Sequence, residues 1–148
     1  MATAYDGTNY AKAADPSSAN ILSPGVLGGK VRVMQDDYTG AVVATADYIR
    51  IGKALPTGAQ VVDIIVGNTA TGSGNYLTVG DEGSATRYIT SYSTSGANVK
   101  MGPSANAGMN YTVTGTTDNI IRVYSGGTAG AAPLSGGTIK VTVFYTVE

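Results

Sequence analysis

The feature that most constrains this chain is the pattern of residues 29–148, where short segments of alternating apolar and polar residues are separated by turn-forming residues. Clusters of Gly, Asn, Asp and Ser recur about every eight to twelve residues, a spacing typical of β-sandwiches and β-barrels. No window contains an amphipathic helix of useful length, because the poor helix formers Thr, Val, Tyr and Gly dominate throughout. We therefore expect an all-β protein.

Several segments are predicted to be strands: residues 31–34, 48–53, 60–66, 75–80, 86–92, 97–101, 110–114, 119–124 and 138–147. The last is the most regular, because Ile139, Val141 and Val143 alternate with Lys140 and Thr142. The absence of a repeat with a fixed period argues against a propeller or a solenoid. We expect an antiparallel β-sandwich of jelly-roll type, with a different Greek-key sandwich or a barrel as the alternative.

The segment Gln60–Val66 is nearly continuous in apolar residues, which predicts a strand covered on both sides at the centre of the core. The expected core positions come from this segment and the last one: Val61, Ile64, Val66, Val141 and Val143. Just before it, Leu55–Ala59 is predicted to be a turn, since Pro56 fixes φ and Gly58 can adopt a positive φ. The strands on either side are expected to meet as a hairpin or as a corner.

Residues 1–28 differ from the rest of the chain, because they are rich in Ala, Ser, Asn, Gly and Pro and follow neither a helical nor a strand period. We predict an extended N-terminal arm, residues 1–28, followed by a β-sandwich domain, residues 29–148. Two interpretations of the arm stay open. It is a disordered terminus, or it becomes ordered on a partner through its apolar anchors Tyr5, Tyr10, Ile21 and Leu22.

Composition excludes many functions. The 148 residues include no His, Cys or Trp, which removes thiol and imidazole nucleophiles, zinc sites built on Cys or His, and disulfides. The formal net charge is −1 and no two basic residues are adjacent, so nucleic acid is not an expected partner. The apolar stretches are shorter than the roughly 20 residues of a membrane span, so no membrane partner is expected. The N-terminus does not resemble a secretory signal, which predicts synthesis in a cytosol unless a signal has been removed.

The most distinctive local pattern is the segment Gly80–Tyr88, in which Asp81 and Glu82 lie between two glycines. A calcium loop needs alternating oxygen ligands and a distal bidentate acid, which this segment lacks, so a cation site is the weaker interpretation. We expect a loop between strands in which Asp81 and Arg87 form a partly exposed structural pair or cap backbone amides. No metal or cofactor site is predicted.

Two further features were weighed as candidate sites. The adjacent Asp36 and Asp37 would point to opposite faces of a strand, so they cannot flank one glycosidic bond, and a turn or an exposed charge is expected instead. The 10 Tyr residues occur with no Trp, which favours sheet edges and subunit contacts over a sugar-binding platform. Since no convergent set of catalytic side chains is apparent, the protein is not expected to be an enzyme.

Segments in order along most of the chain resemble small structural proteins of tailed bacteriophages, the capsid decoration (cement) proteins and their head-fibre relatives: Ala4–Tyr10, Pro24-Gly25, Gly28–Asp36, Ile51–Ala59 and Gly80–Tyr88. These motifs are structural turns without catalytic content. The resemblance implies a β-sandwich, typically trimeric, on the outside of the mature head. There it would bind the major capsid protein and tie neighbouring capsid subunits together.

On this basis we expect a structural virion protein of the outer capsid surface, assembled in the host cytoplasm as a homo-oligomer, with a trimer as the expected state. The arm residues Tyr5, Tyr10, Ile21 and Leu22 are the expected capsid-binding positions. Low charge suits association through apolar and backbone contacts. A phage tail-fibre or receptor-binding module that recognises a host glycan is the alternative. A small hydrolase is the enzymatic rival, and it lacks a recognisable set of catalytic groups.

Overall fold

The computed structural model describes residues 30–39, 43, 47–72, 74–102, 108–109, 111–126 and 134–147. The expected arm, including Tyr5, Tyr10, Ile21 and Leu22, and its boundary with the sandwich lie outside the described residues. No described segment is a helix long and apolar enough to cross a membrane.

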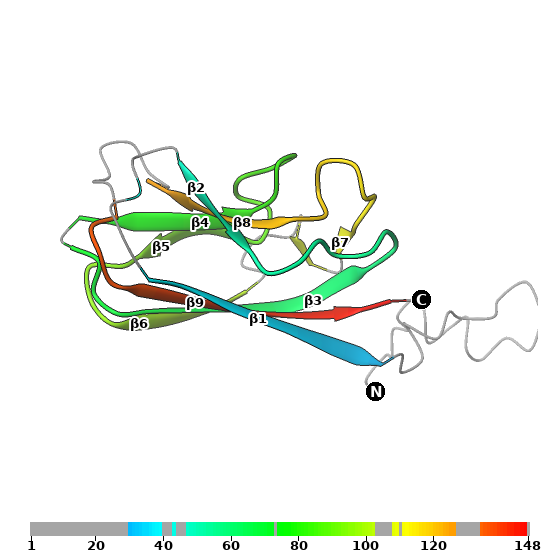
Figure 1. Ribbon diagram of the computed structural model, residues 1–148, viewed down its shortest axis with the longest axis horizontal. Helices are drawn as coiled ribbons and strands as arrows, with labels where there is room; N and C mark the ends of the chain where they lie inside the picture. Colours follow the sequence, from blue (N-terminus) through cyan, green and yellow to red (C-terminus); the bar gives the residue numbers. More distant parts are fainter. Residues whose placement is uncertain are drawn as a thin grey trace, which may run out of the picture.

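The described residues form two antiparallel sheets packed as two layers (Figure 1). Their strands are β1 (Val31–Thr39), β2 (Tyr48–Ile51), β3 (Gln60–Asn68), β4 (Tyr76–Gly80), β5 (Ile89–Ser93), β6 (Asn98–Gly102), β7 (Tyr111–Thr112), β8 (Ile121–Ser125) and β9 (Thr138–Thr146). Sheet I has the order β1-β9-β3-β6, with the short β7 also pairing with β3. Sheet II has the order β2-β8-β4-β5. The predicted all-β sandwich is confirmed.

The chain passes repeatedly between the two sheets. The first strand, β1, pairs with the last, β9, without interruption from Val31 opposite Thr146 to Thr39 opposite Thr138. Consecutive strands β1, β2, β3 and β4 lie alternately in sheets I and II. A five-stranded and a four-stranded sheet therefore exchange strands along the sequence.

The predicted turn at Leu55–Ala59 is present and makes a corner between the sheets. The Ala59 amide donates to the Pro56 carbonyl at 3.0 Å, and Gly58 has a φ of 83°. Glycine adopts this φ without the steric cost that a Cβ would impose. Because β2 belongs to sheet II and β3 to sheet I, the corner is formed and the hairpin is not.

The core lies between the facing sides of the two sheets. All five predicted core positions are confirmed, since none of their side chains is more than 1% exposed: Val61, Ile64, Val66, Val141 and Val143. Sheet II contributes the facing apolar side chains Ile51, Leu77, Val79, Ile121 and Val123. Each buried aliphatic side chain of this kind stabilises the fold by about 1.5 to 3 kcal/mol relative to exposure.

The prediction that β3 is covered on both sides is wrong. Val62 is 41% exposed and Ile65 is only partly buried, whereas Ile64 and Val66 are fully buried. The register between β3 and β9 shifts between Val61 and Asp63, which marks a bulge. Because a bulge inserts one extra residue, the buried positions 61, 64 and 66 lie on one face despite their uneven spacing. The apolar run in β3 therefore has two causes. The bulge shifts the alternation of buried residues by one position, and the outer face of the strand also carries apolar residues.

Of the differences from the expected strand boundaries, the two largest are in β1 and β5. β1 continues past residue 34 to Thr39 because its whole length pairs with β9. β5 begins at Ile89 and not at residue 86, since the preceding residues form a compact loop. In that loop the amides of Asp81 and Arg87 donate to the carbonyl of Ser84 at 3.0 and 3.3 Å.

Candidate interaction surfaces

The structure brings Asp81 and Arg87 together in the loop between β4 and β5. Arg87 Nε donates to Asp81 Oδ2 at 2.5 Å and Nη2 donates to Oδ1 at 3.2 Å, while the Ser84 amide donates to Asp81 Oδ1 at 2.9 Å. The expectation of partial exposure holds for Arg87, whose side chain is 15% exposed, and is wrong for Asp81, whose side chain is 0% exposed. A Cβ at Gly80 would lie 1.9 Å from the Ser84 carbonyl oxygen, so only glycine lets the loop close over the carboxylate.

Arg87 also links this loop to the segment between β7 and β8. Its guanidinium carbon lies 3.8 Å from the centroid of the Tyr111 ring, a cation–π contact. The Gly83 amide donates to the Thr117 carbonyl at 3.2 Å. The hydrogen bond from Arg87 to Asp81 raises the pKa of Arg87, so the guanidinium keeps its charge despite burial. Two loops that are distant in sequence are thus held together at one end of sheet II.

Asp118 holds the second loop in shape. Its carboxylate accepts hydrogen bonds from the Tyr111 hydroxyl at 2.7 Å, the Thr114 amide at 2.7 Å, the Thr114 hydroxyl at 2.8 Å and the Gly115 amide at 2.8 Å. Burial by itself raises the pKa of Asp118, but these hydrogen bonds outweigh it and hold the pKa well below its ordinary value. The carboxylate is therefore occupied by loop donors, as expected for a structural group.

Asp36 and Asp37 lie within β1 and not in a turn, so of the two expected roles the exposed charge is the one found, at Asp37. Asp36 Oδ2 accepts a hydrogen bond from the Gly52 amide at 2.6 Å, and the Lys53 amide donates to the sulfur of Met34 at 3.3 Å. Asp37 is exposed and lies opposite Lys140 in the β1–β9 register. Asp36 thus ties the edge strand of sheet I to the end of the edge strand of sheet II.

Within the described residues no group of three or more His, Cys, Asp or Glu side chains comes together. The charged groups Asp81, Arg87 and Asp118 of the loops at this end of sheet II are engaged in structural contacts. The outer faces of the two sheets carry the larger exposed side chains.

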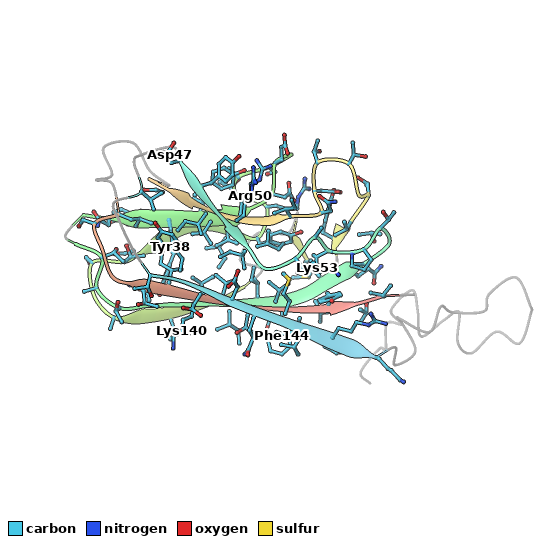
Figure 2. All side chains as sticks on the ribbon, viewed as in Figure 1. Tyr38, Asp47, Arg50, Lys53, Lys140 and Phe144 are labelled. Carbon is cyan, nitrogen blue, oxygen red and sulfur yellow. The ribbon has the colours of Figure 1, made fainter. Side chains whose placement is uncertain are left out.

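The outer face of sheet I is unusually apolar for a face that points away from the core. Val33 is 53% exposed and lies opposite the single Phe of the chain, Phe144, which is partly exposed. Val99, further along the sheet on β6, is 70% exposed. Figure 2 shows Lys140 and Phe144 projecting from the side of sheet I that faces away from sheet II. Exposed apolar patches on sandwich faces mark contact sites more often than isolated apolar residues do.

This face is also hollowed. A depression of about 380 Å³ lies over the central strands, where Gly67 on β3 has Lys140 and Val99 as its register neighbours. Since Gly67 has no side chain, the rows on either side form the walls of the depression. An apolar side chain of another molecule would fit this shape.

The outer face of sheet II has a different character and contains a cluster that we call the Arg–Tyr platform: Tyr48, Arg50, Arg122 and Tyr124. In the β2–β8 register, Tyr48 lies opposite Tyr124 and Arg50 lies opposite Arg122. The two Tyr rings are 5.5 Å apart and tilted by 53°. The guanidinium carbons of Arg122 and Arg50 lie 4.4 and 5.9 Å from the centroid of the Tyr48 ring.

The platform is fixed to its surroundings by polar contacts. Arg122 Nη2 donates to Glu82 Oε2 at 2.6 Å, and the Tyr124 hydroxyl donates to the Asp81 carbonyl at 2.7 Å. Burial by itself lowers the pKa of Arg122, but Tyr124 and Glu82 outweigh this and raise the pKa above its ordinary value. Tyr48 remains 40% exposed, so the platform presents its ring to solvent. Arg50, which is labelled in Figure 2, is also exposed.

Sequence reasoning missed the platform. A signal was present, because Tyr48 and Arg50 are two residues apart, as are Arg122 and Tyr124, and residues with this spacing share a strand face. The four side chains meet only because β2 and β8 pair in one particular register, across about 70 residues of intervening chain.

No family model matches the chain, and no curated protein matches it. Among solved structures, the chain is similar to one from the capsid asymmetric unit of cyanophage Pam1, with 28% identity and a TM-score of 0.63. That match covers 91% of this chain and 99% of the other. A chain from the capsid of Ralstonia phage GP4 has the same fold, with 20% identity, a TM-score of 0.60, and coverage of 81% of this chain and 86% of the other.

Proposed function

We propose that this protein is a structural component of a bacteriophage virion and that it associates with capsid proteins. The observation that carries the proposal is the similarity over 91% of the chain, at 28% identity, to nearly the whole length of a chain in the Pam1 capsid asymmetric unit. A match of this extent involves the complete sandwich and not only a local motif. The interaction surfaces described above suit a protein that works by contact.

Within that role, we propose that the chain decorates the outside of the head and bridges major capsid subunits. A small sandwich with an exposed apolar face on sheet I and a charged aromatic platform on sheet II has two separate contact surfaces. Bridging needs at least two such surfaces on one molecule. Many copies on a repeating lattice would turn modest single contacts into firm attachment.

We further propose that the protein acts as a homotrimer and that residues 1–28 form an arm that grips the capsid through Tyr5, Tyr10, Ile21 and Leu22. At about 3.3 Å per residue, an extended arm of this length reaches roughly 90 Å. Such a reach spans neighbouring capsid subunits. Ordering the arm costs about 1 to 2 kcal/mol per residue, so its anchors must enter pockets or its backbone must extend a sheet.

The test is to measure the native mass of the purified protein and then its co-sedimentation with empty phage heads, with and without residues 1–25. We expect a trimer mass, saturable binding of the full chain, and weaker binding of the shortened chain with unchanged thermal stability. A monomer at tens of micromolar contradicts the trimer. Absence of head binding together with binding to a host glycan array would support the receptor-binding alternative instead.

A further inference from the structure

We infer that the Arg–Tyr platform on the outer face of sheet II docks an acidic side chain of the capsid partner, whose carboxylate binds Arg50 beside the Tyr48 ring. This inference rests on the proposed function, because it names the chemistry with which one surface of the chain meets its partner. It assigns to sheet II a contact separate from the apolar face of sheet I.

The first argument is the charge of the platform. Arg50 and Arg122 lie directly opposite each other in the register, and like charges in this position repel. Glu82 neutralises Arg122 through a contact of 2.6 Å. Within the described residues Arg50 forms no ion pair, so the platform has one cation that is not neutralised. A carboxylate is the group that complements this charge, and a guanidinium binds it through two parallel hydrogen bonds.

The second argument is that the platform is already organised. The Tyr48 ring is held by the Tyr124 ring and by the guanidinium of Arg122, and the Tyr124 hydroxyl is anchored to the Asp81 backbone. Immobilising a side chain on binding costs free energy, and that cost is small where the side chain is already fixed. The exposed edge of Tyr48 therefore offers a rigid surface next to a charged group with its donors free for a partner.

The third argument concerns the class of partner. Tyr and Arg, with Trp, are enriched among the residues that dominate the binding energy of protein–protein contacts. Tyr48 and Arg50 also line a depression of about 660 Å³, together with Tyr38, Val43, Asp47 and Ile49, so the choice of partner is made on residue type and not on shape. The residue types favour a protein carboxylate, and an acidic sugar becomes an outcome of the test.

The experiment compares head binding of the full-length wild type with that of Arg50→Glu and Arg50→Gln, with Arg32→Glu as the matched control. Arg32 is an exposed arginine on β1 in sheet I, so its reversal changes the net charge equally at another place. We expect Arg50→Glu to weaken co-sedimentation with empty heads by roughly tenfold or more and Arg50→Gln by less. Binding of the wild type should weaken as salt increases, and the salt dependence should be smaller for Arg50→Gln.

The outcomes separate the inference from the proposed function. If the wild type binds heads and both Arg50 variants bind equally well, or if Arg32→Glu is weakened as much as Arg50→Glu, the platform inference is wrong and the virion role stands. If the wild type does not bind heads, the proposed function fails and the inference fails with it. Binding to immobilised polysialic acid that Arg50→Glu abolishes, without any effect of Arg50 on head binding, would assign the platform to an acidic glycan and overturn the proposal. Because Arg50 is exposed, all variants should melt within a few degrees of the wild type.

Discussion

Sheet I is formed mainly by the nine-residue strands β1, β3 and β9, and sheet II by strands of four or five residues. Their outer faces differ in how the side chains are satisfied. On sheet II, Tyr48, Arg122 and Tyr124 contact one another, and Glu82 and the Asp81 backbone complete their polar contacts. On sheet I, Val33 and Val99 remain more than half exposed.

The two faces differ because polar and apolar side chains are stabilised by different interactions. Charged and hydrogen-bonding groups can be satisfied by neighbours on the same face, so the sheet II face is largely ordered within the single chain. An exposed apolar side chain lowers the free energy only when water is removed from it, and this requires a second surface that covers it. Substitutions of the mutually paired groups of sheet II and its loops should therefore change the stability of the isolated chain, whereas substitutions of residues that remain exposed, Val33 and Val99 on sheet I and Arg50 on sheet II, should change association.

The largest expected effect is on the ion pair beneath the sheet II loops. Arg87→Ala should lower the free energy of unfolding by about 3 to 5 kcal/mol, because it leaves the fully buried carboxylate of Asp81 without its cation. Urea denaturation measures this loss. Arg50→Ala is the control and should cost less than about 0.5 kcal/mol, since Arg50 is exposed and forms no ion pair within the described residues. Equal losses for the two variants would contradict the contrast between buried and exposed arginines.

The next largest effect compares the loss of stability caused by a substitution on the inner face of sheet I with that of the same substitution on its outer face. Ile64→Ala should cost about 2 to 5 kcal/mol, because Ile64 is fully buried and its removal leaves a cavity. The adjacent Ile65 is only partly buried on the outer face, so Ile65→Ala should cost about 1 kcal/mol. Chemical denaturation of the two variants compares identical deletions one residue apart. A larger loss for Ile65→Ala would mean that the bulge in β3 is placed wrongly.

A third expected effect is a loss of about 1 to 3 kcal/mol in the free energy of unfolding when the charge of Asp118 is removed. This loss depends on pH. Its folded-state pKa lies below the ordinary value near 3.9, so its stabilisation is present above about pH 4 and is lost as the pH falls through the folded-state pKa. Asp118→Asn should be less stable than the wild type at pH 7, and the difference should shrink progressively as the pH falls from about 4 towards 2. Thermal unfolding between these pH values measures the difference. A constant difference at every pH would show that the charge of Asp118 is not the cause.

The smallest expected effect on stability is at the exposed apolar residues of sheet I. Val33→Thr and Val99→Thr should each change the free energy of unfolding by less than about 0.5 kcal/mol, because both side chains are already exposed to water. The same substitutions should weaken self-association or head binding, measured by analytical ultracentrifugation and co-sedimentation. Unchanged association in the double variant would show that this apolar face is not a contact surface.

Much of the fold follows from local pattern. The period of two and the regular spacing of turn residues predicted the all-β sandwich, and Pro56 and Gly58 predicted the turn before β3, with a hairpin and a corner both open. Of the core positions, Val141 and Val143 follow from strict alternation, whereas Val61, Ile64 and Val66 were predicted from a nearly continuous apolar run. The candidate sites were harder, since Asp81 was expected to be partly exposed and is fully buried. Its burial depends on how closely Gly80 lets the loop fold back on itself.

By itself, the sequence determined the strand-forming segments, the apolar side of most strands and the positions of tight turns, because these depend on residues close together in the chain. The tertiary structure decided the bulge at Val61 and Asp63, the burial of the Asp81–Arg87 pair and the meeting of Tyr48 and Arg50 with Arg122 and Tyr124. Strand register and loop burial arise from pairing between distant segments. The alternation of apolar and polar residues in one strand is compatible with many partner strands and registers. Local sequence patterns therefore cannot specify the register or the burial of the loops.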